Sequence, residues 1–167
     1  MGRLVVMRHS KAEQDGPTDF ERPLADRGLR DAADAGAWLA NTGFVPDHAL
    51  VSAALRTRET WASLAGGASW TLEPDFDRGL YAAGPETAID LIRLVPDEVD
   101  SLLVIGHNPT MAYLAQLLDS GDGPSGAGDA LEGDFPTSAL AVFGYDGAWA
   151  DLTTGSADLV ASYVGRG

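Results

Sequence analysis

Two of the three histidines in the chain stand where they could do chemistry. His9 follows a short apolar run and comes directly after Arg8, and His107 follows the strongest apolar run of the chain. Each run predicts a buried strand, so each histidine is expected just beyond the carboxyl end of a strand. An imidazole can act as nucleophile, acid or base near neutral pH, and the paired placement favours a shared site over two unrelated loop residues. The third histidine, His48, lies in a proline-containing loop, and we assign it no role.

Arg56 is a further candidate, because it falls in the expected first turn of a helix that follows another strand. A cation there opposes the helix dipole. Binding of an anion at the helix N-terminus would explain that cost, since a guanidinium holds phosphate in a fork of two hydrogen bonds. The alternative is an exposed arginine paired with Glu59 or another surface acid. From this residue alone both interpretations stay open.

Composition sets the class of protein. The 167 residues are 45% apolar and 22% charged, which predicts one folded domain over residues 1–167. No apolar run is long enough for a signal peptide or a membrane span, so we expect a cytoplasmic protein without a membrane partner. The absence of cysteine excludes disulfides, thiolate zinc sites and cysteine nucleophiles.

Charge is distributed unevenly along the chain. The formal net charge is −14, yet residues 1–58 hold eight of the eleven Lys and Arg residues and are neutral as a segment. The remainder carries the whole excess of negative charge. This excludes general nucleic-acid binding, which needs a basic face. An anionic ligand must therefore be bound by a local cluster of cations and backbone N–H groups.

The elements that must position these residues can be read from periodicity and turn signals. Helices are expected at 25–40, 55–64, 85–94 and 110–118, and strands at 4–7, 49–52, 70–72, 101–105, 139–144 and 149–153. The Asp-Gly pair within 145–148 predicts a hairpin between the last two strands. The segment 119–134 is rich in glycine and acidic residues and reads as a flexible loop insertion.

This order predicts an α/β fold: a three-layer α/β/α sandwich with a mostly parallel central sheet and an antiparallel C-terminal edge hairpin. In such sheets the ligand crevice lies beyond the carboxyl ends of the strands. Both histidines are expected at that edge.

Six blocks, in this order and at these spacings, give the chain a specific resemblance. It resembles the histidine phosphatase, or phosphoglycerate-mutase-like, superfamily, and within it the small phosphohistidine phosphatase branch. The blocks lie at residues 7–12, 19–28, 52–60, 80–83, 106–109 and 135–141.

The resemblance implies a role for each matching residue. His9 would be the nucleophile that becomes phosphorylated, and His107 would be the second active-site histidine. Arg8 and Arg56 would bind the phosphoryl group, with Arg22 as a further contact. Ser10 and Asn108, which adjoin the two histidines, are the remaining candidates for substrate binding.

The chemistry is consistent with these residue types. A neutral imidazole can attack phosphorus and form a covalent phosphohistidine, which splits hydrolysis into two displacements. The transition state spreads negative charge over three oxygens, and Arg8, Arg56 and a protonated His107 would supply the balancing cations. We therefore expect no metal and no cofactor, and a loss of about 10²-fold or more in rate when one cation is removed.

The general acid is the departure from the wider family pattern. The stretch 73–81 shows no clear equivalent of the usual glutamate, and Asp77 is the nearest candidate. An alkoxide leaving group needs protonation, whereas the imidazole of a phosphohistidine can leave without a strong positioned acid.

The sequence therefore predicts a metal-independent phosphatase that works through phospho-His9 and acts on a phosphohistidine of a protein, releasing inorganic phosphate. One alternative is a broad phosphomonoesterase for small phosphorylated substrates. The other is a phosphoprotein-binding module without turnover. No P-loop or serine-hydrolase motif is present.

Overall fold

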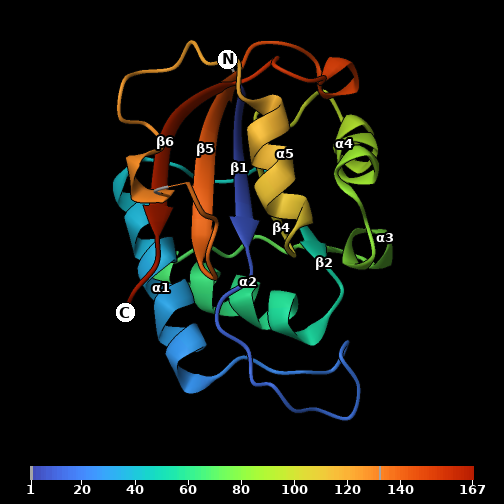
Figure 1. Ribbon diagram of the computed structural model, residues 1–167, viewed down its shortest axis with the longest axis vertical. Coiled ribbons are helices and arrows are strands. Elements are labelled where there is room, and N and C mark those ends of the chain that lie inside the picture. The colour runs from blue at the N-terminus through green and yellow to red at the C-terminus, as the bar shows by residue number, and fades with distance from the viewer. Residues whose placement is uncertain (1, 132) are drawn as a thin grey trace.

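A computed structural model describes residues 2–131 and 133–167, and its six strands form one sheet in the order β3-β2-β4-β1-β5-β6 (Figure 1). The first four strands in this order are mutually parallel. Strand β5 runs antiparallel to its neighbours β1 and β6. The strands are β1 (Gly2–Arg8), β2 (His48–Ser52), β3 (Asp75–Asp77), β4 (Ser101–Gly106), β5 (Ala139–Tyr145) and β6 (Asp158–Val164).

Helices cover both faces of the sheet, which confirms the three-layer α/β/α prediction (Figure 1). The pair α1 and α2 packs on one face, and α4 and α5 pack on the other. The helices are α1 (Asp26–Asn41), α2 (Leu55–Ala68), α3 (Arg78–Tyr81), α4 (Pro85–Arg93) and α5 (Thr110–Leu118), with short 3-10 turns η1 (Asp129–Leu131) and η2 (Trp149–Asp151).

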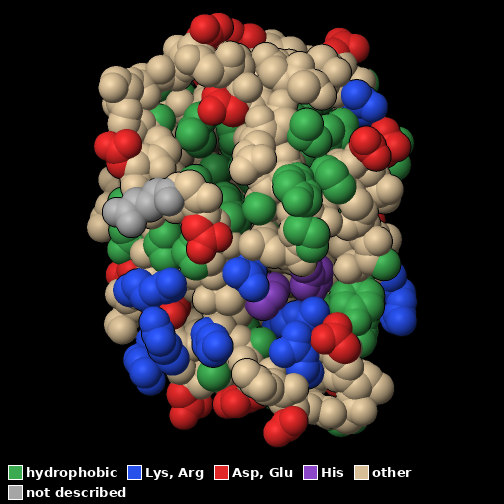
Figure 2. Space-filling view, viewed as in Figure 1, with side chains coloured by type: hydrophobic (Ala, Val, Ile, Leu, Met, Phe, Trp, Pro, Cys, Tyr) green, Lys and Arg blue, Asp and Glu red, His purple; other side chains and the backbone are tan. Residues whose placement is uncertain are grey.

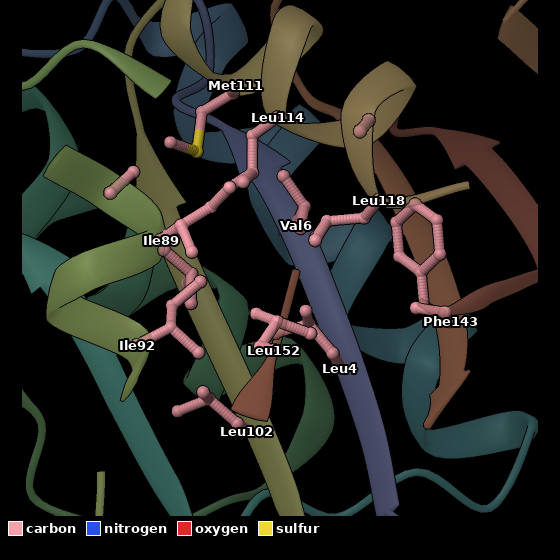
Figure 3. Close-up of a cluster of buried hydrophobic side chains, with 14 of the residues drawn as sticks. Leu4, Val6, Ile89, Ile92, Leu102, Met111, Leu114, Leu118, Phe143 and Leu152 are labelled. Carbon is pink, nitrogen blue, oxygen red and sulfur yellow. The ribbon is translucent and has the colours of Figure 1, made fainter. Parts of the chain in front are cut away.

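The apolar run of β1 is continuous because both of its faces are buried. Leu4 and Val6 belong to the cluster under α4 and α5, where Figure 3 shows Val6 near Leu114 and Leu118, and Leu4 near Leu152. Val5 and Met7 belong to the opposite cluster, under α1 and α2. Burial of each such side chain contributes about 1.5–3 kcal/mol, so β1 is anchored from both sides and its carboxyl end is held in place.

Two glycines set the spacing between α1 and α2. A Cβ at Gly36 would lie 2.0 Å from the Leu64 carbonyl oxygen, and one at Gly67 would lie 2.1 Å from that of Ala33. Only glycine allows this approach, and the approach fixes α2 against its neighbour. The first turn of α2 carries Arg56, so this contact helps to place that side chain.

Two strand predictions were wrong. Residues 70–72 are not a strand, and the third parallel strand is β3, a few residues later. The Trp70 ring instead packs on the rings of Phe44 and Trp61, with centroid distances of 6.0 and 6.1 Å. Side-chain packing outside the sheet therefore explains this apolar signal.

The antiparallel C-terminal edge is confirmed, but the predicted turn at 145–148 and the predicted strand at 149–153 were wrong. After β5 the chain forms η2, where Trp149 packs on Tyr145 and donates its indole N–H to the Val99 carbonyl at 2.7 Å. The antiparallel partner of β5 is β6, which begins at Asp158. The apolar signal at 149–153 comes from Trp149 and Leu152, which are buried and close the end of the core.

The acidic segment 119–134 consists of turns and η1 in the part that the structure describes; Met1 and Glu132 lie outside the described residues. It is attached by a bridge between Asp119 and Ala157, the residue before β6, and by a hydrogen bond of 2.6 Å from the Ser162 hydroxyl in β6 to the Ala127 carbonyl. Within the described residues, no helix is long and apolar enough to cross a membrane.

Candidate active site

The two histidines meet at the carboxyl edge of the parallel strands. Arg8 and Gly106 are partners in the parallel pairing of β1 with β4, so the next residue of each strand reaches the same end of the sheet. The His9 backbone N–H donates to the Gly106 carbonyl at 3.0 Å. The ring centroids of His9 and His107 lie 5.4 Å apart, so the structure brings the two side chains together.

His9 is held in one tautomer. Its Nδ1 lies 2.7 Å from the Ser10 carbonyl oxygen, and because a carbonyl only accepts, Nδ1 carries the proton. Nε2 is then the unprotonated nitrogen. Burial lowers the pKa of His9 to about 4, with a smaller lowering from nearby arginines and a partial opposing effect of the Ser10 carbonyl. The ring is therefore neutral at pH 7, as a nitrogen nucleophile must be.

His107 has a different partner. Its Nε2 lies 2.7 Å from the Ser52 hydroxyl, and its buried Nδ1 has no hydrogen-bond partner among the described residues. Burial lowers the pKa of His107 to about 3, with further lowering from His9 and Arg56. His107 is therefore neutral at pH 7 in the site without a bound phosphoryl group, contrary to the expectation of a protonated His107. A phosphoryl dianion beside the ring would favour the charged form and raise this pKa.

Two arginines bring positive charge to the histidines. Arg8 lies at the end of β1 and donates from Nη1 to the Phe135 carbonyl at 3.3 Å; burial lowers its pKa, partly offset by Asp134. Arg56 is 6% exposed and sits in the first turn of α2. Neither Nε has a partner among the described residues. Each side chain thus keeps at least one donor that a bound anion could use.

The third predicted contact, Arg22, reaches the site from the loop between β1 and α1. It lines a cavity of about 300 Å³ together with Arg8 and His9. Its Nη1 donates to the Glu13 carbonyl at 3.0 Å, and its Nε donates to Asp19 at 3.0 Å. Arg22 therefore joins the cluster of cations around His9.

Asp19 is the residue that the sequence reasoning missed. Its carboxylate accepts from Arg22, from Arg56 at 3.2 Å and from the Tyr81 hydroxyl at 2.5 Å, and its carbonyl accepts from Arg56 at 2.7 Å. The Tyr81 hydrogen bond and then the charge of Arg56 lower the pKa of Asp19 to about 2, so it is ionised at neutral pH. Both residues lie within the matching sequence blocks, which was the available signal.

Ser10 and Asn108 lie at the site, but their side chains are engaged with the protein. The Ser10 hydroxyl accepts from Ser138 at 2.5 Å, and Asn108 donates to the Phe135 carbonyl at 2.7 Å. The same carbonyl accepts from Arg8. These contacts hold the two histidine loops against the segment before β5, so both residues support the shape of the site.

Asp77 is not brought to the histidines by any contact that the structure records. It ends β3, and its carboxylate accepts the Gly79 backbone N–H at 2.6 Å, which caps the short helix α3. That arrangement gives Asp77 a structural task. His48, the first residue of β2, has its Nε2 3.9 Å from a carboxylate oxygen of Asp75. The described residues contain no group of three or more His, Cys, Asp or Glu side chains arranged to hold a metal ion.

Comparison with known proteins agrees with this arrangement. A sequence model described as histidine phosphatase superfamily (branch 1) matches residues 4–81. An uncharacterised protein of Mycobacterium tuberculosis is 42% identical over 96% of this chain and 100% of its own length. The phosphohistidine phosphatase SixA of Escherichia coli is 29% identical over 83% of each chain. A solved structure of a SixA from Nakamurella, described as a putative phosphohistidine phosphatase, superposes with a TM-score of 0.85 at 32% identity, covering 98% of this chain and 96% of the other.

Proposed function

Because the chain belongs to the histidine phosphatase superfamily, in its small SixA-like branch, and is a hydrolase of phosphoester or phosphohistidine bonds, we propose that its substrate is a phosphohistidine on a protein and that it needs no metal ion. His9 is the nucleophile in this proposal, and Arg8, Arg56 and His107 surround the phosphoryl group.

The observation that carries the proposal is the state of Asp19. Its carboxylate accepts hydrogen bonds from the Tyr81 hydroxyl, Arg56 and Arg22, and these contacts lower its pKa to about 2. An ionised carboxylate has no proton to give. A sugar or serine alkoxide would need such a proton, whereas an imidazole leaves as a neutral ring. A site with this electrostatics therefore favours a phosphorus–nitrogen bond over an ester.

The first step transfers the phosphoryl group between two imidazoles. The Nε2 lone pair of His9 forms the new nitrogen–phosphorus bond, and the substrate nitrogen takes the electron pair of the bond that breaks. The substrate ring, protonated on its second nitrogen, departs as neutral imidazole. His9 becomes a cation, which the Ser10 carbonyl stabilises through the hydrogen bond already present at Nδ1.

In the second step water attacks phospho-His9, and inorganic phosphate is released as the ring regains its lone pair. Both transition states carry spread negative charge on three oxygens. Contacts with Phe135 and Asp19 already hold the Arg8 and Arg56 side chains, so their positive charges stabilise this negative charge with little reorganisation. These fixed cations take the part that a metal ion plays in other phosphatases.

The test compares turnover of a phosphohistidine-containing protein and of p-nitrophenyl phosphate by wild type and His9→Ala, each in excess EDTA. We expect both activities to persist in EDTA and to vanish with His9. A phosphoserine protein, whose leaving group is an alkoxide, should be hydrolysed at least about 10²-fold more slowly than the phosphohistidine protein.

Three results would contradict the proposal. Loss of activity in EDTA would refute metal independence, and equal rates on phosphoserine and phosphohistidine would indicate a general phosphomonoesterase. Tight binding of the phosphoprotein without any turnover would indicate a binding module.

A further inference from the structure

Three exposed cations, which the mechanism above does not use, lie next to one another beside the cavity. We call Lys11, Arg27 and Arg166 the basic rim. Lys11 lines the cavity with His9, and its carbonyl accepts from the Ala25 N–H at 2.9 Å, directly before α1. The rim therefore starts at the mouth of the site and continues onto the first turn of α1, where Arg27 stands.

Arg166 completes the rim from the other end of the chain. Arg27 and Arg166 approach the same carboxylate, Asp31, at 3.6 and 3.5 Å. Arg166 also donates to the carbonyl of Thr137, another residue of the cavity wall, at 3.1 Å. Figure 2 shows Lys and Arg side chains gathered beside the two histidines at this end of the molecule.

The rim keeps a surplus of positive charge. The Asp31 side chain is 2% exposed and is shared by two arginines whose side chains are 61% and 43% exposed. One buried carboxylate thus serves two outward-facing cations, a second acid, Asp34, accepts the Arg166 backbone N–H at 3.0 Å, and Lys11 forms no ion pair within the described residues. In a chain of net charge −14, such a surplus beside the phosphoryl site calls for an explanation.

We propose that the basic rim binds acidic side chains that flank the phosphorylated histidine of the protein substrate. This inference rests on the proposed function and adds the charge of the partner to it. The distance over which charges act is about 8–10 Å at physiological salt, so an acidic segment at the cavity mouth meets the rim and is screened from most of the remaining negative surface.

A nucleic acid fits the same surface poorly. It would need a basic face long enough to neutralise several regularly spaced phosphates. The chain next to the rim carries its own exposed acids, Glu13, Asp15 and Asp26, so the positive surface is short. A short acidic segment beside one phosphohistidine matches the length of this positive surface.

The test uses two fluorescein-labelled peptides with one central phosphohistidine, flanked on both sides by three Glu in one and by three Gln in the other. Dissociation constants are measured in the His9→Ala background, where the peptides are not consumed. Two surface ion pairs predict about fivefold tighter binding of the Glu peptide, and the preference should disappear at 1 M NaCl.

Matched variants locate the effect. Lys11→Gln with Arg27→Gln removes two cations of the rim, and Arg3→Gln with Arg58→Gln removes two exposed cations elsewhere. The preference for the Glu peptide should fall to about one in the first variant and persist in the second. Equal binding of both peptides by the parent, or the same preference in both double variants, would overturn the inference.

Failure of the proposed function would be visible separately. Wild type with an intact His9 is assayed for hydrolysis of the same two peptides. If it hydrolyses neither peptide but still binds the Glu peptide more tightly through the rim, the proposed phosphohistidine substrate is wrong, and the inference that the rim binds acidic side chains is retained.

Discussion

His9 and His107 end neighbouring strands of one sheet, but their surroundings differ in one respect that decides their chemistry. The ring of His9 is bound by a backbone carbonyl, which can only accept, so its proton stays on Nδ1. The ring of His107 is bound by the Ser52 hydroxyl, which can donate or accept. The first arrangement suits a nucleophile, and the second suits a group that changes its protonation when the phosphoryl dianion arrives.

The largest expected effect comes from replacing each histidine with alanine. His9→Ala should lower kcat by about 10³-fold or more, because the covalent route is lost. His107→Ala should cost about 10²-fold, since it removes one stabilising group and leaves the nucleophile. Trapping of the labelled phosphoenzyme by alkaline denaturation, in which the phosphorus–nitrogen bond survives, decides the roles: label on residue 9 in His107→Ala is expected, whereas label on residue 107 in His9→Ala would reverse them.

Asp19→Asn should have a smaller effect, about tenfold on kcat/KM. The carboxylate holds Arg22 and Arg56 and raises the pKa of His107, whereas it is not among the groups that shift the pKa of His9. The substitution should therefore weaken substrate binding by the arginines and lower the pKa of His107. Steady-state kinetics with p-nitrophenyl phosphate will show this as a higher KM, and Asp19→Glu should restore part of it. An unchanged KM would mean that Asp19 does not orient the arginines.

Ser52→Ala should change the rate by only a few-fold but should move the pH profile. Loss of the hydroxyl leaves His107 Nε2 without its partner, so the acid limb of kcat against pH should shift. Ser10→Ala provides the comparison, because the His9 partner is the backbone carbonyl and survives that substitution. Ser10→Ala should leave the acid limb in place, whatever its effect on the rate. Equal shifts in both variants would show that the Ser52 hydroxyl does not act specifically on His107.

The smallest expected effect is on stability in acid. The pKa values of His9 and His107, about 4 and 3, lie below the ordinary value of 6.5, so the unfolded chain takes up protons first as pH falls. The free energy of unfolding should therefore decrease between about pH 6.5 and pH 4. Urea titrations across this window should show a flatter decrease for His107→Gln. The pKa of Asp19 is lowered from 3.8 to about 2, so its contribution is lost mainly below about pH 4, at the lower edge of this window.

Local pattern was enough to predict much of the fold. The runs around Val5 and Val104 are buried on both faces, so hydrophobicity alone indicates a strand. The same rule failed at Trp70 and Trp149, because an aromatic side chain that packs on other rings or closes the end of a core looks apolar in the same way. Strand β6 was missed because its partly exposed residues give a weak signal.

The sequence by itself determined which residue types end β1, β4 and β2, and therefore that two histidines and two arginines meet at one edge of a parallel sheet. That conclusion needs only strand direction and chain order. Tertiary structure alone decided the partners: Ser10 carbonyl for His9, Ser52 for His107 and Asp19 for the arginines. The Ser52–His107 and Asp19–Arg56 contacts depend on distances of a few tenths of an ångström between segments 55 and 37 residues apart. No local pattern encodes such distances, because they are set by the packing of the whole core.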